Sequence, residues 1–447
     1  MGNEQLTQID AFTLREEIAT GRQSVADVLE ASLQQIGATE ESVQAWEFLD
    51  EQHARGQAGA LAAYRDSGRA LGSLHGIPVG IKDIFDTADQ PTKNGNALDS
   101  ARQTEKDATV VARLRAAGAL IMGKTVTAEC AYLAPGKTRN PFNPEHTPGG
   151  SSSGSAAAVA AGMVPCAIGT QTGGSIIRPA AYCGVIGFKP TFGLLPRTGV
   201  LRCSPHLDTV GTFSRSLEDA ALLVDAMAGF DGMDPDVAPM APPRLLETLQ
   251  EAAPVKPQFA FVKTSAWADV DQDTADGFAE LADALGDSCD EMTLPSIFDE
   301  APVMHRRIML AEMAHNLRPY YDRGADKLSP ETRAAVEEGR EISATDYLSA
   351  LTWRDTLYAG LEEIFDRYDA IITPAATSAA PKGLESTGTA ACNVLWSLTG
   401  VPAVTLPLLS DSQGLPVGVQ LIDRRHADGR LLRTARWLEN YLANLEG

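Results

Sequence analysis

The chain has 447 residues, of which 44 % are hydrophobic and 21 % are charged, so it can bury a large core. Its formal net charge is −22, from 37 basic and 59 acidic side chains. So acidic a chain repels polyphosphate, which excludes nucleic acid as an expected partner.

The cysteines and the apolar runs exclude two further classes of protein. No two cysteines form a C-x-x-C pair, so we expect neither a zinc site nor a disulfide framework. Glu4, Asp10 and Arg15 interrupt the N-terminal segment, which therefore does not resemble a signal peptide. No apolar run approaches the ~20 residues that span a membrane. We therefore expect a cytoplasmic protein without membrane contact.

Helices and strands are predicted to alternate along the chain. Helical spacing of apolar residues, or an alanine-rich run, predicts helices over 5–37, 51–66, 108–117, 152–162, 217–227 and 430–445. Short apolar runs predict strands over 45–50, 75–85, 119–122, 164–169, 184–190, 210–213, 259–262, 370–374 and 415–422. A short helix is expected from Ser175, and the Pro-, Asn- and Gly-rich stretch 135–150 is expected to be a loop.

The stretch from about 265 to 368 is helix-rich and charged, with little motif content, and is the expected variable section. The chain has no repeats and no long linker. Alternating elements without a linker favour one large α/β domain over residues 1–447 rather than two domains.

Two segments satisfy well-known motifs only literally. Gly118 to Thr125 fits the Walker A pattern, but its Ala-Leu-Ile-Met centre predicts a buried strand rather than a loop around a phosphate. Gly150 to Gly154 fits G-x-S-x-G with Ser152 as nucleophile, but that elbow must directly follow a strand, and this one follows a loop. The glycine-serine stretch is no flexible linker either, because it continues into an alanine-rich helix.

A second glycine-rich turn leads into Ser175. Gly173 and Gly174 can adopt positive φ, which would let successive N–H groups converge beside the serine hydroxyl. Such an arrangement at a helix N-terminus would stabilise a tetrahedral oxyanion. The alternatives are an anion-binding turn and an ordinary strand-to-helix corner.

A nucleophilic serine needs a base, and the sequence offers two kinds. Three histidines in the motif region could complete a Ser-His-Asp set, namely His75, His146 and His206. Lys82 is the one cation in the apolar run 77–85, where desolvation would favour its neutral form. The alternative for Lys82 is a salt-bridged strand residue, with Asp83 or Asp86 as the partner.

Three motifs together resemble those of the amidase signature family. They are G-I-P-x-x-I-K-D ending at Asp83, P-G-G-S-S-S-G-S-A-A-A-V-A-A-G at 148–162, and T-G-G-S ending at Ser175. The separation of Ser151 and Ser175 matches the family as well. The resemblance spans about 70–215 and resumes at 370–437.

The resemblance implies a role for each motif residue. Ser175 matches the nucleophile, Lys82 the base, and Ser151 a bridging serine that carries a cis peptide bond. Neutral Lys82 would accept the proton of Ser151 while Ser151 accepts that of Ser175. Ser152 matches a serine that supports the site by hydrogen bonding. The implied oxyanion hole consists of four consecutive N–H groups, those of Thr172, Gly173, Gly174 and Ser175.

This chain departs from the commonest family pattern at two positions. Gln171 stands where Asp is usual, and Arg178 follows the nucleophile by three residues rather than two. With Ser153, these changes resemble the malonamidase branch, in which the equivalent arginine holds the substrate carboxylate. Arg178 would therefore clamp short acids such as malonamate. The alternative is that it bonds nearby backbone carbonyls whatever the substrate.

The resemblance implies an α/β fold, with a large twisted mixed sheet covered by helices on both faces. It implies an amide hydrolase that forms an acyl-enzyme on small acyl amides, with esters and carbamates as extensions. No cofactor or metal is expected, and a homodimer is. The alternatives are the A subunit of a tRNA-dependent amidotransferase, which the acidic charge disfavours, and a non-catalytic binding protein.

The substrate pocket is expected above Ser175. Its walls are predicted to come from the late strands, the 130–140 loop and part of 300–400. Tyr132, Met309 and Trp396 are candidates for the lining, and each fits a core position equally well.

Overall fold

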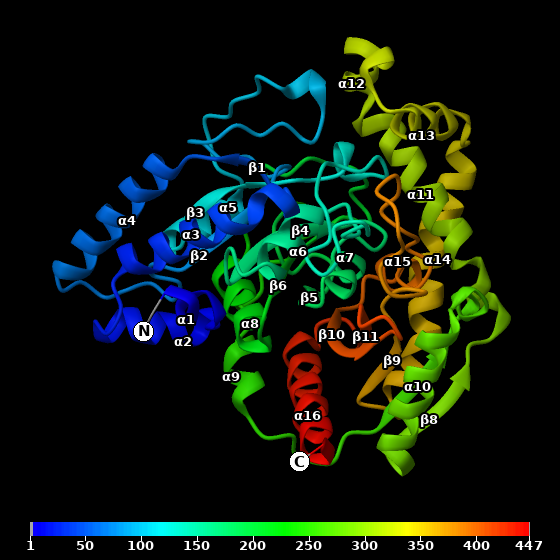
Figure 1. Cartoon of the computed structure of the whole chain (residues 1–447). Coiled ribbons are helices and arrows are strands. Elements are labelled where there is room, and N and C mark those ends of the chain that lie inside the picture. Colours follow the sequence, from blue (N-terminus) through cyan, green and yellow to red (C-terminus); the bar gives the residue numbers. More distant parts are fainter. Residues whose placement is uncertain (1–2, 447) are drawn as a thin grey trace.

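The computed structural model describes residues 3–446, and within these residues eleven strands form one sheet across the middle of the molecule (Figure 1). The strands are β1 (Trp46–Leu49), β2 (Pro78–Lys82), β3 (Leu120–Thr125), β4 (Cys166–Gln171), β5 (Ile186–Lys189), β6 (Thr209–Ser214), β7 (Phe259–Lys263), β8 (Cys289–Thr293), β9 (Ala370–Pro374), β10 (Ala403–Ser410) and β11 (Pro416–Ile422). Their order in the sheet is β1-β3-β2-β4-β6-β5-β10-β11-β9-β7-β8.

The sheet is mixed. β2 runs parallel to β3 and β4, and β7 parallel to β8 and β9, whereas β10 is antiparallel to both β5 and β11. Helices lie on both sides of it, so the expected α/β fold with a large mixed sheet is confirmed.

The helices in chain order are α1 (Asn3–Gln8), α2 (Ala11–Thr20), α3 (Val25–Val43), α4 (Glu51–Asp66), α5 (Thr109–Ala116), α6 (Ser153–Ala160), α7 (Ile177–Tyr182), α8 (Leu217–Met227), α9 (Leu245–Gln250), α10 (Gln272–Leu285), α11 (Ala301–Asn316), α12 (Arg318–Gly324), α13 (Pro330–Glu341), α14 (Ala344–Phe365), α15 (Val394–Leu398) and α16 (Asp428–Glu446). None of these described helices combines the length and the apolar character needed to cross a membrane.

Strand β7 illustrates why both faces of the sheet are covered. Phe259 and Phe261 join a hydrophobic core that includes side chains of α8 and α16. The intervening Ala260 and Val262 join a second core with side chains of α7 and α14. Because successive strand residues point to opposite faces, a continuous apolar run places side chains in both cores.

The helical prediction for 5–37 resolves into three helices with specific caps. Asp10 caps the N-terminus of α2, which ends at Gly21 in the left-handed conformation (φ 77°). Ser24 caps α3 by accepting the N–H of Asp27, the interaction that its position in the sequence suggests. The short polar segment 21–24 separates α2 from α3.

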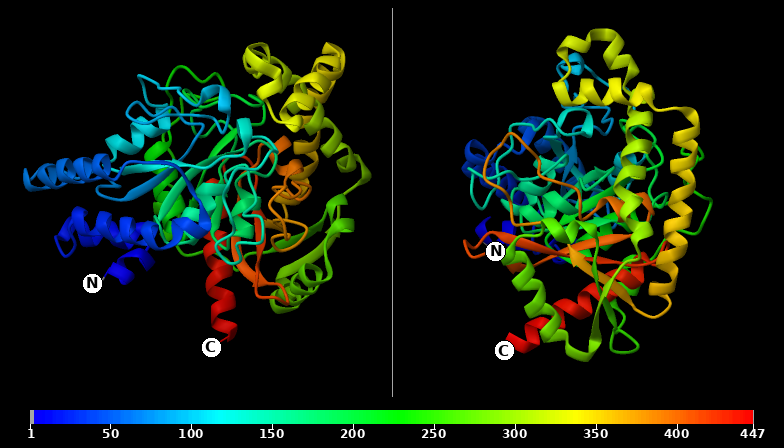
Figure 2. Two further views of the ribbon diagram at one scale, coloured as in Figure 1. Left: turned by 45° about the horizontal axis from the view of Figure 1, so that its top comes forward. Right: turned by 90° about the vertical axis from the view of Figure 1, so that its right-hand side faces the viewer.

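The prediction for 265–368 was incomplete. This section contains α10 to α14, but it also contains β8, a strand at the edge of the sheet whose side chains are half-buried or exposed and whose sequence has no apolar run. Helices α13 and α14 both pack against α11 (Figure 2). Strand β10 was also not predicted, and α7 begins at Ile177 rather than at Ser175.

Candidate active site

Lys82 lies at the carboxyl end of β2, and its side chain is completely buried. Because β2 and β4 are parallel neighbours, the ends of both strands reach the same edge of the sheet. Lys82 Nζ lies 2.8 Å from Ser151 Oγ and 3.0 Å from Thr170 Oγ1. The structure therefore brings together a buried lysine and the serine of the glycine-serine motif.

The salt-bridge interpretation of Lys82 is wrong. Asp83 forms its ion pair with Lys124, at 3.3 Å, and Asp86 pairs with Arg102, at 2.8 Å. No ion pair of Lys82 is formed in the described part of the chain. Burial lowers the pKa of Lys82 to about 7, against the opposing effect of the negative charge of Asp208. A large fraction of this amine is therefore neutral near pH 7 and can accept a proton.

Ser151 follows a cis peptide bond from Gly150, as the resemblance implied, and stands two residues before α6. The neighbouring Ser152 is completely buried, and its Oγ donates to the carbonyl oxygen of Thr170 at 3.2 Å. Ser152 does not follow a strand and is closed off from solvent, so the nucleophile-elbow geometry is absent.

The Walker-like segment is a buried strand, as the apolar centre predicted. It forms β3, in which Lys124 Nζ donates to Phe85 O at 2.8 Å and to Thr92 Oγ1 at 2.7 Å. With its ammonium group committed to these buried acceptors, the lysine is not part of a phosphate-binding loop.

Ser175 lies in the turn between β4 and α7, and its side chain is 7 % exposed. Its Oγ makes no hydrogen bond to any described residue, and it lines a cavity. Gln171 organises this turn, because its Oε1 accepts the N–H groups of Ile176 at 2.9 Å and Ile177 at 3.0 Å. The sequence marked Gln171 only as a departure from the family and gave no sign of this capping role.

Four consecutive backbone N–H groups lie in this turn, the last of them that of Ser175. The N–H groups of residues 172–175 have no hydrogen-bond acceptor among residues 3–446. The expectation of positive φ at Gly173 and Gly174 was wrong, since neither is among the glycines with that conformation. Glycine is required at 174 for another reason: a Cβ there would lie 2.4 Å from Asn393 Oδ1.

The cavity beside Ser175 has a volume of about 280 Å³. It is lined by Ala131, Tyr132, Leu133, Thr172, Gly173, Gly174, Ser175, Arg178, Cys203, Pro302, His305, Arg306, Met309, Gly388, Thr389, Ala390 and Val394. The 130–140 loop and part of 300–400 form its walls, as predicted. The late strands do not, and the loop before α15 takes their place.

Two of the three proposed lining residues are correct. Tyr132 and Met309 line the cavity, whereas Trp396 is completely buried in the core beneath α15. The position of Trp396 on a short apolar helix fits a core residue as well as a pocket residue, so the sequence did not distinguish these two locations.

Arg178 lies on α7 and is 3 % exposed. Its Nη2 donates to Gly150 O at 2.6 Å and to Thr387 Oγ1 at 3.3 Å, while its Nε is buried without a partner in the described chain. Burial lowers the pKa of the guanidinium, and no carboxylate of residues 3–446 pairs with it. The cavity therefore contains a positive charge whose hydrogen bonding is incomplete.

The three histidines named from the sequence lie elsewhere. His146 Nδ1 contacts Ala380 O at 2.6 Å, His206 is bonded to Glu312, and the ring of His75 lies 6.0 Å from that of Tyr64. None of them lines the cavity, whereas His305 does. His305 stands in the motif-poor section, and nothing in the sequence pointed to it.

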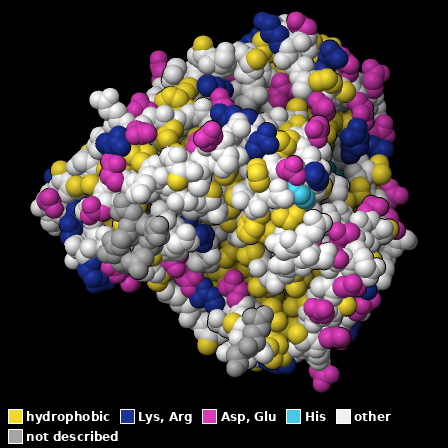
Figure 3. Space-filling view, viewed as in Figure 1, with side chains coloured by type: hydrophobic (Ala, Val, Ile, Leu, Met, Phe, Trp, Pro, Cys, Tyr) yellow, Lys and Arg dark blue, Asp and Glu magenta, His cyan; other side chains and the backbone are white. Residues whose placement is uncertain are grey.

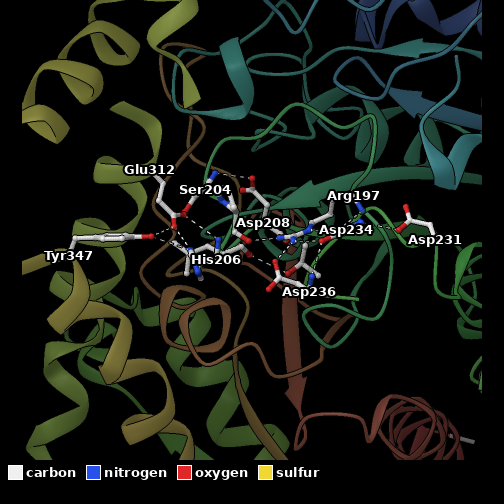
Figure 4. A network of polar contacts seen from close by, with 12 residues as sticks. Arg197, Ser204, His206, Asp208, Asp231, Asp234, Asp236, Glu312 and Tyr347 are labelled. Atoms are coloured by element: carbon white, nitrogen blue, oxygen red, sulfur yellow. Dashed lines mark hydrogen bonds and ion pairs between the residues drawn. The ribbon is translucent and has the colours of Figure 1, made fainter. Parts of the chain in front are cut away.

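Asp208 stabilises the turn before Ser175 by hydrogen bonding. Its carboxylate accepts Thr172 Oγ1 at 2.6 Å and the N–H groups of Cys203 at 2.9 Å and Ser204 at 2.8 Å. Burial raises the pKa of Asp208 to about 6. Figure 4 shows Asp208 in the middle of a polar network that extends to Arg197 and Asp234 on one side and to Glu312 on the other.

Comparison with known proteins gives one consistent family. The family model described as Amidase matches residues 27–432. The A subunit of the glutamyl-tRNA(Gln) amidotransferase of Symbiobacterium thermophilum is 34 % identical over 472 residues, which cover 96 % of this chain and 95 % of that protein. The native peptide amidase of Stenotrophomonas maltophilia has a TM-score of 0.85 at 28 % identity, with 96 % of each chain covered. A protein of a vestigial complex linked to the origins of an s-triazine catabolic enzyme has a TM-score of 0.90 at 28 % identity, covering 97 % of this chain and 98 % of that one.

Proposed function

Since the chain belongs to the amidase family of carbon–nitrogen hydrolases, we propose that it cleaves small acyl amides with Ser175 as nucleophile, Ser151 as proton bridge and Lys82 as base. The observation that carries this proposal is the 2.8 Å contact between Lys82 Nζ and Ser151 Oγ inside the protein. A buried lysine with a pKa of about 7 and no carboxylate partner in residues 3–446 is suited to proton transfer.

Acylation begins with two coupled proton transfers. Neutral Lys82 accepts the Ser151 proton, Ser151 accepts the Ser175 proton, and Ser175 Oγ bonds to the amide carbonyl carbon. The oxygen of the tetrahedral intermediate lies against the N–H groups of 172–175, which have no acceptor within the described chain. The proton then returns along the same path to the nitrogen, and the C–N bond breaks to release the amine and leave an ester on Ser175.

Water completes the cycle by the same path. The relay removes a proton from the water, the hydroxide adds to the ester carbonyl, and Ser175 leaves with the returned proton. The products are the carboxylic acid and the free enzyme. Esters and carbamates present the same carbonyl carbon, so they are further substrates of this chemistry.

Arg178 is proposed to bind a carboxylate on the acyl part of the substrate. Its buried guanidinium lines the cavity, has an unpartnered Nε and lacks a carboxylate partner within the described residues. Its hydrogen bond to Gly150 O supports the alternative, in which it holds the backbone before Ser151. Activity on short acids that carry a terminal amide, such as malonamate, distinguishes carboxylate binding from the role in holding the backbone.

The experiment that tests the activity is a panel of small amides, esters and carbamates assayed on the purified chain alone. We expect release of acid and amine by the wild type and none by Ser175→Ala. Ser288→Ala, which changes a buried serine outside the cavity, is the matched control and should keep full activity. Activity that survives Ser175→Ala would contradict the proposal.

A second candidate function is that of an amidotransferase A subunit. The 34 % identity over 96 % of the chain with such a protein favours it. It predicts that glutamine is the preferred amide and that further protein chains are required for activity. Acidic side chains spread over the face seen in Figure 3, among scattered Lys and Arg, and the net charge of −22 disfavours a position beside tRNA.

A further inference from the structure

The carbonyl groups of the oxyanion loop, defined here as residues 172–175, are held by hydrogen bonds at its first three positions. Thr172 O lies 2.9 Å from His305 Nε2, and Gly173 O accepts Ser397 Oγ at 2.6 Å. Gly174 O accepts the N–H of Arg178 at 3.0 Å, the first helical bond of α7. The loop therefore has anchored carbonyls and N–H groups without an acceptor among residues 3–446.

These two features are linked by the geometry of the peptide bond. In a trans peptide the C=O of one residue and the N–H of the next point in opposite directions in one plane. A donor that fixes Thr172 O therefore aims the N–H of Gly173 away from that donor. In the same way, the bond to Gly173 O aims the N–H of Gly174.

His305 is suited to act as a permanent donor. A carbonyl oxygen can only accept, so Nε2 must carry the hydrogen. Burial lowers the pKa of His305, which favours the neutral ring. The ring also packs against the loop, since a Cβ on Gly173 would lie 3.5 Å from His305 Cε1.

The two donors come from elements outside the motif that contains the serine. His305 lies on α11, on the helix face that also presents Pro302, Arg306 and Met309 to the cavity. Ser397 lies on α15 and additionally accepts Gln171 Nε2 at 3.0 Å. The same helix that lines the cavity thus contacts the backbone that receives the substrate oxygen.

We infer that His305 and Ser397 are positioning residues, which orient the Gly173 and Gly174 N–H groups toward the carbonyl oxygen of the substrate in the transition state. This inference rests on the proposed function, because the loop acts as an oxyanion hole only if Ser175 is the nucleophile. Neither residue transfers a proton or bonds to the substrate in this role.

The test compares His305→Leu, which removes the donor, with His305→Gln, whose amide nitrogen occupies about the place of Nε2. Deleting an oxyanion donor outright costs about 10²–10³ in kcat, so loosening one should cost about tenfold. We expect His305→Leu to lower kcat about tenfold with KM within about twofold of wild type, and His305→Gln to restore most of kcat. Affinity for a small alkyl boronic acid, which forms a tetrahedral adduct on serine, should fall with kcat.

Three outcomes would overturn the inference. The first is an equal kcat in His305→Leu and His305→Gln, and the second is an unchanged kcat in His305→Leu. The third is a rise in KM alone in His305→Leu, which would mean that His305 only lines the cavity. If His305→Leu does not fold by circular dichroism, Ser397→Ala takes its place, and an unchanged kcat there is equally contradictory. Inactivity of the folded wild type on every amide would instead refute the proposed function.

Discussion

Lys82 and Ser151 lie 69 residues apart in the chain, yet the lysine Nζ and the serine Oγ are 2.8 Å apart in a fully buried position. Strand β2 presents the lysine at its carboxyl end, and the turn before α6 brings the serine to it. A lysine held in this way without a carboxylate partner in residues 3–446 is costly for stability, which suggests that its neutral form is used.

Replacing this lysine should abolish catalysis without unfolding the protein. Lys82→Met keeps the length of the side chain and removes the base, so we expect kcat/KM to fall by about 10²–10⁴. Lys189→Met is the matched control, because Lys189 is also completely buried with a pKa of about 7, but among the described residues it donates only to backbone carbonyls outside the cavity. Equal losses in the two variants, measured on folded protein, would speak against a special role for Lys82.

Activity should rise with pH. Only neutral Lys82 accepts a proton, and burial brings its pKa from the usual lysine range down to about 7. For an uncharged amide, kcat/KM should therefore increase tenfold per pH unit below about 7 and level off above it. A profile that rises only near pH 10 would mean that Lys82 is not the base.

Asp208→Asn should shift the pH profile of kcat/KM. The negative charge of Asp208 raises the pKa of Lys82, so removing it lowers the pKa and shifts the rising limb to lower pH. Asparagine can keep the local bonds, with its oxygen accepting the N–H groups of Cys203 and Ser204 and its amide facing Thr172. A shift to higher pH, or none, would contradict this electrostatic coupling.

Arg178→Ala should remove any preference for carboxylated amides. If the guanidinium binds the substrate carboxylate, the ratio of kcat/KM for malonamate to that for propionamide should fall about ten- to hundredfold. Arg306→Ala is the control, since Arg306 also lines the cavity but is already paired with Glu338. An unchanged ratio in Arg178→Ala would favour the role in holding Gly150.

The sequence was sufficient to predict the elements and site residues that belong to a local pattern or to a motif. The central strands, the helix after Ser152 and the α/β class followed from apolar runs and their alternation, whereas the mixed sheet was implied by the family resemblance. The motif pattern also led to Lys82 and Ser151, which the structure brings into contact. Here local patterning and tertiary packing agree.

Long-range contacts made by residues outside the motifs were beyond the reach of the sequence. His305 reaches Thr172 across 133 residues, and Ser397 reaches Gly173 across 224. Neither residue stands in a recognisable pattern, because a single donor to a backbone carbonyl imposes no spacing on its neighbours. The role of Gly174 was misread for the same reason, since its close neighbour Asn393 is distant in the chain.

The most direct test of the central claim is peptide mapping by mass spectrometry after treatment with a small fluorophosphonate. The account predicts a single adduct on Ser175, which is absent from Lys82→Met and present in Lys189→Met. An adduct on Ser152, or an adduct on Ser175 that forms equally fast without Lys82, would contradict the proposed relay.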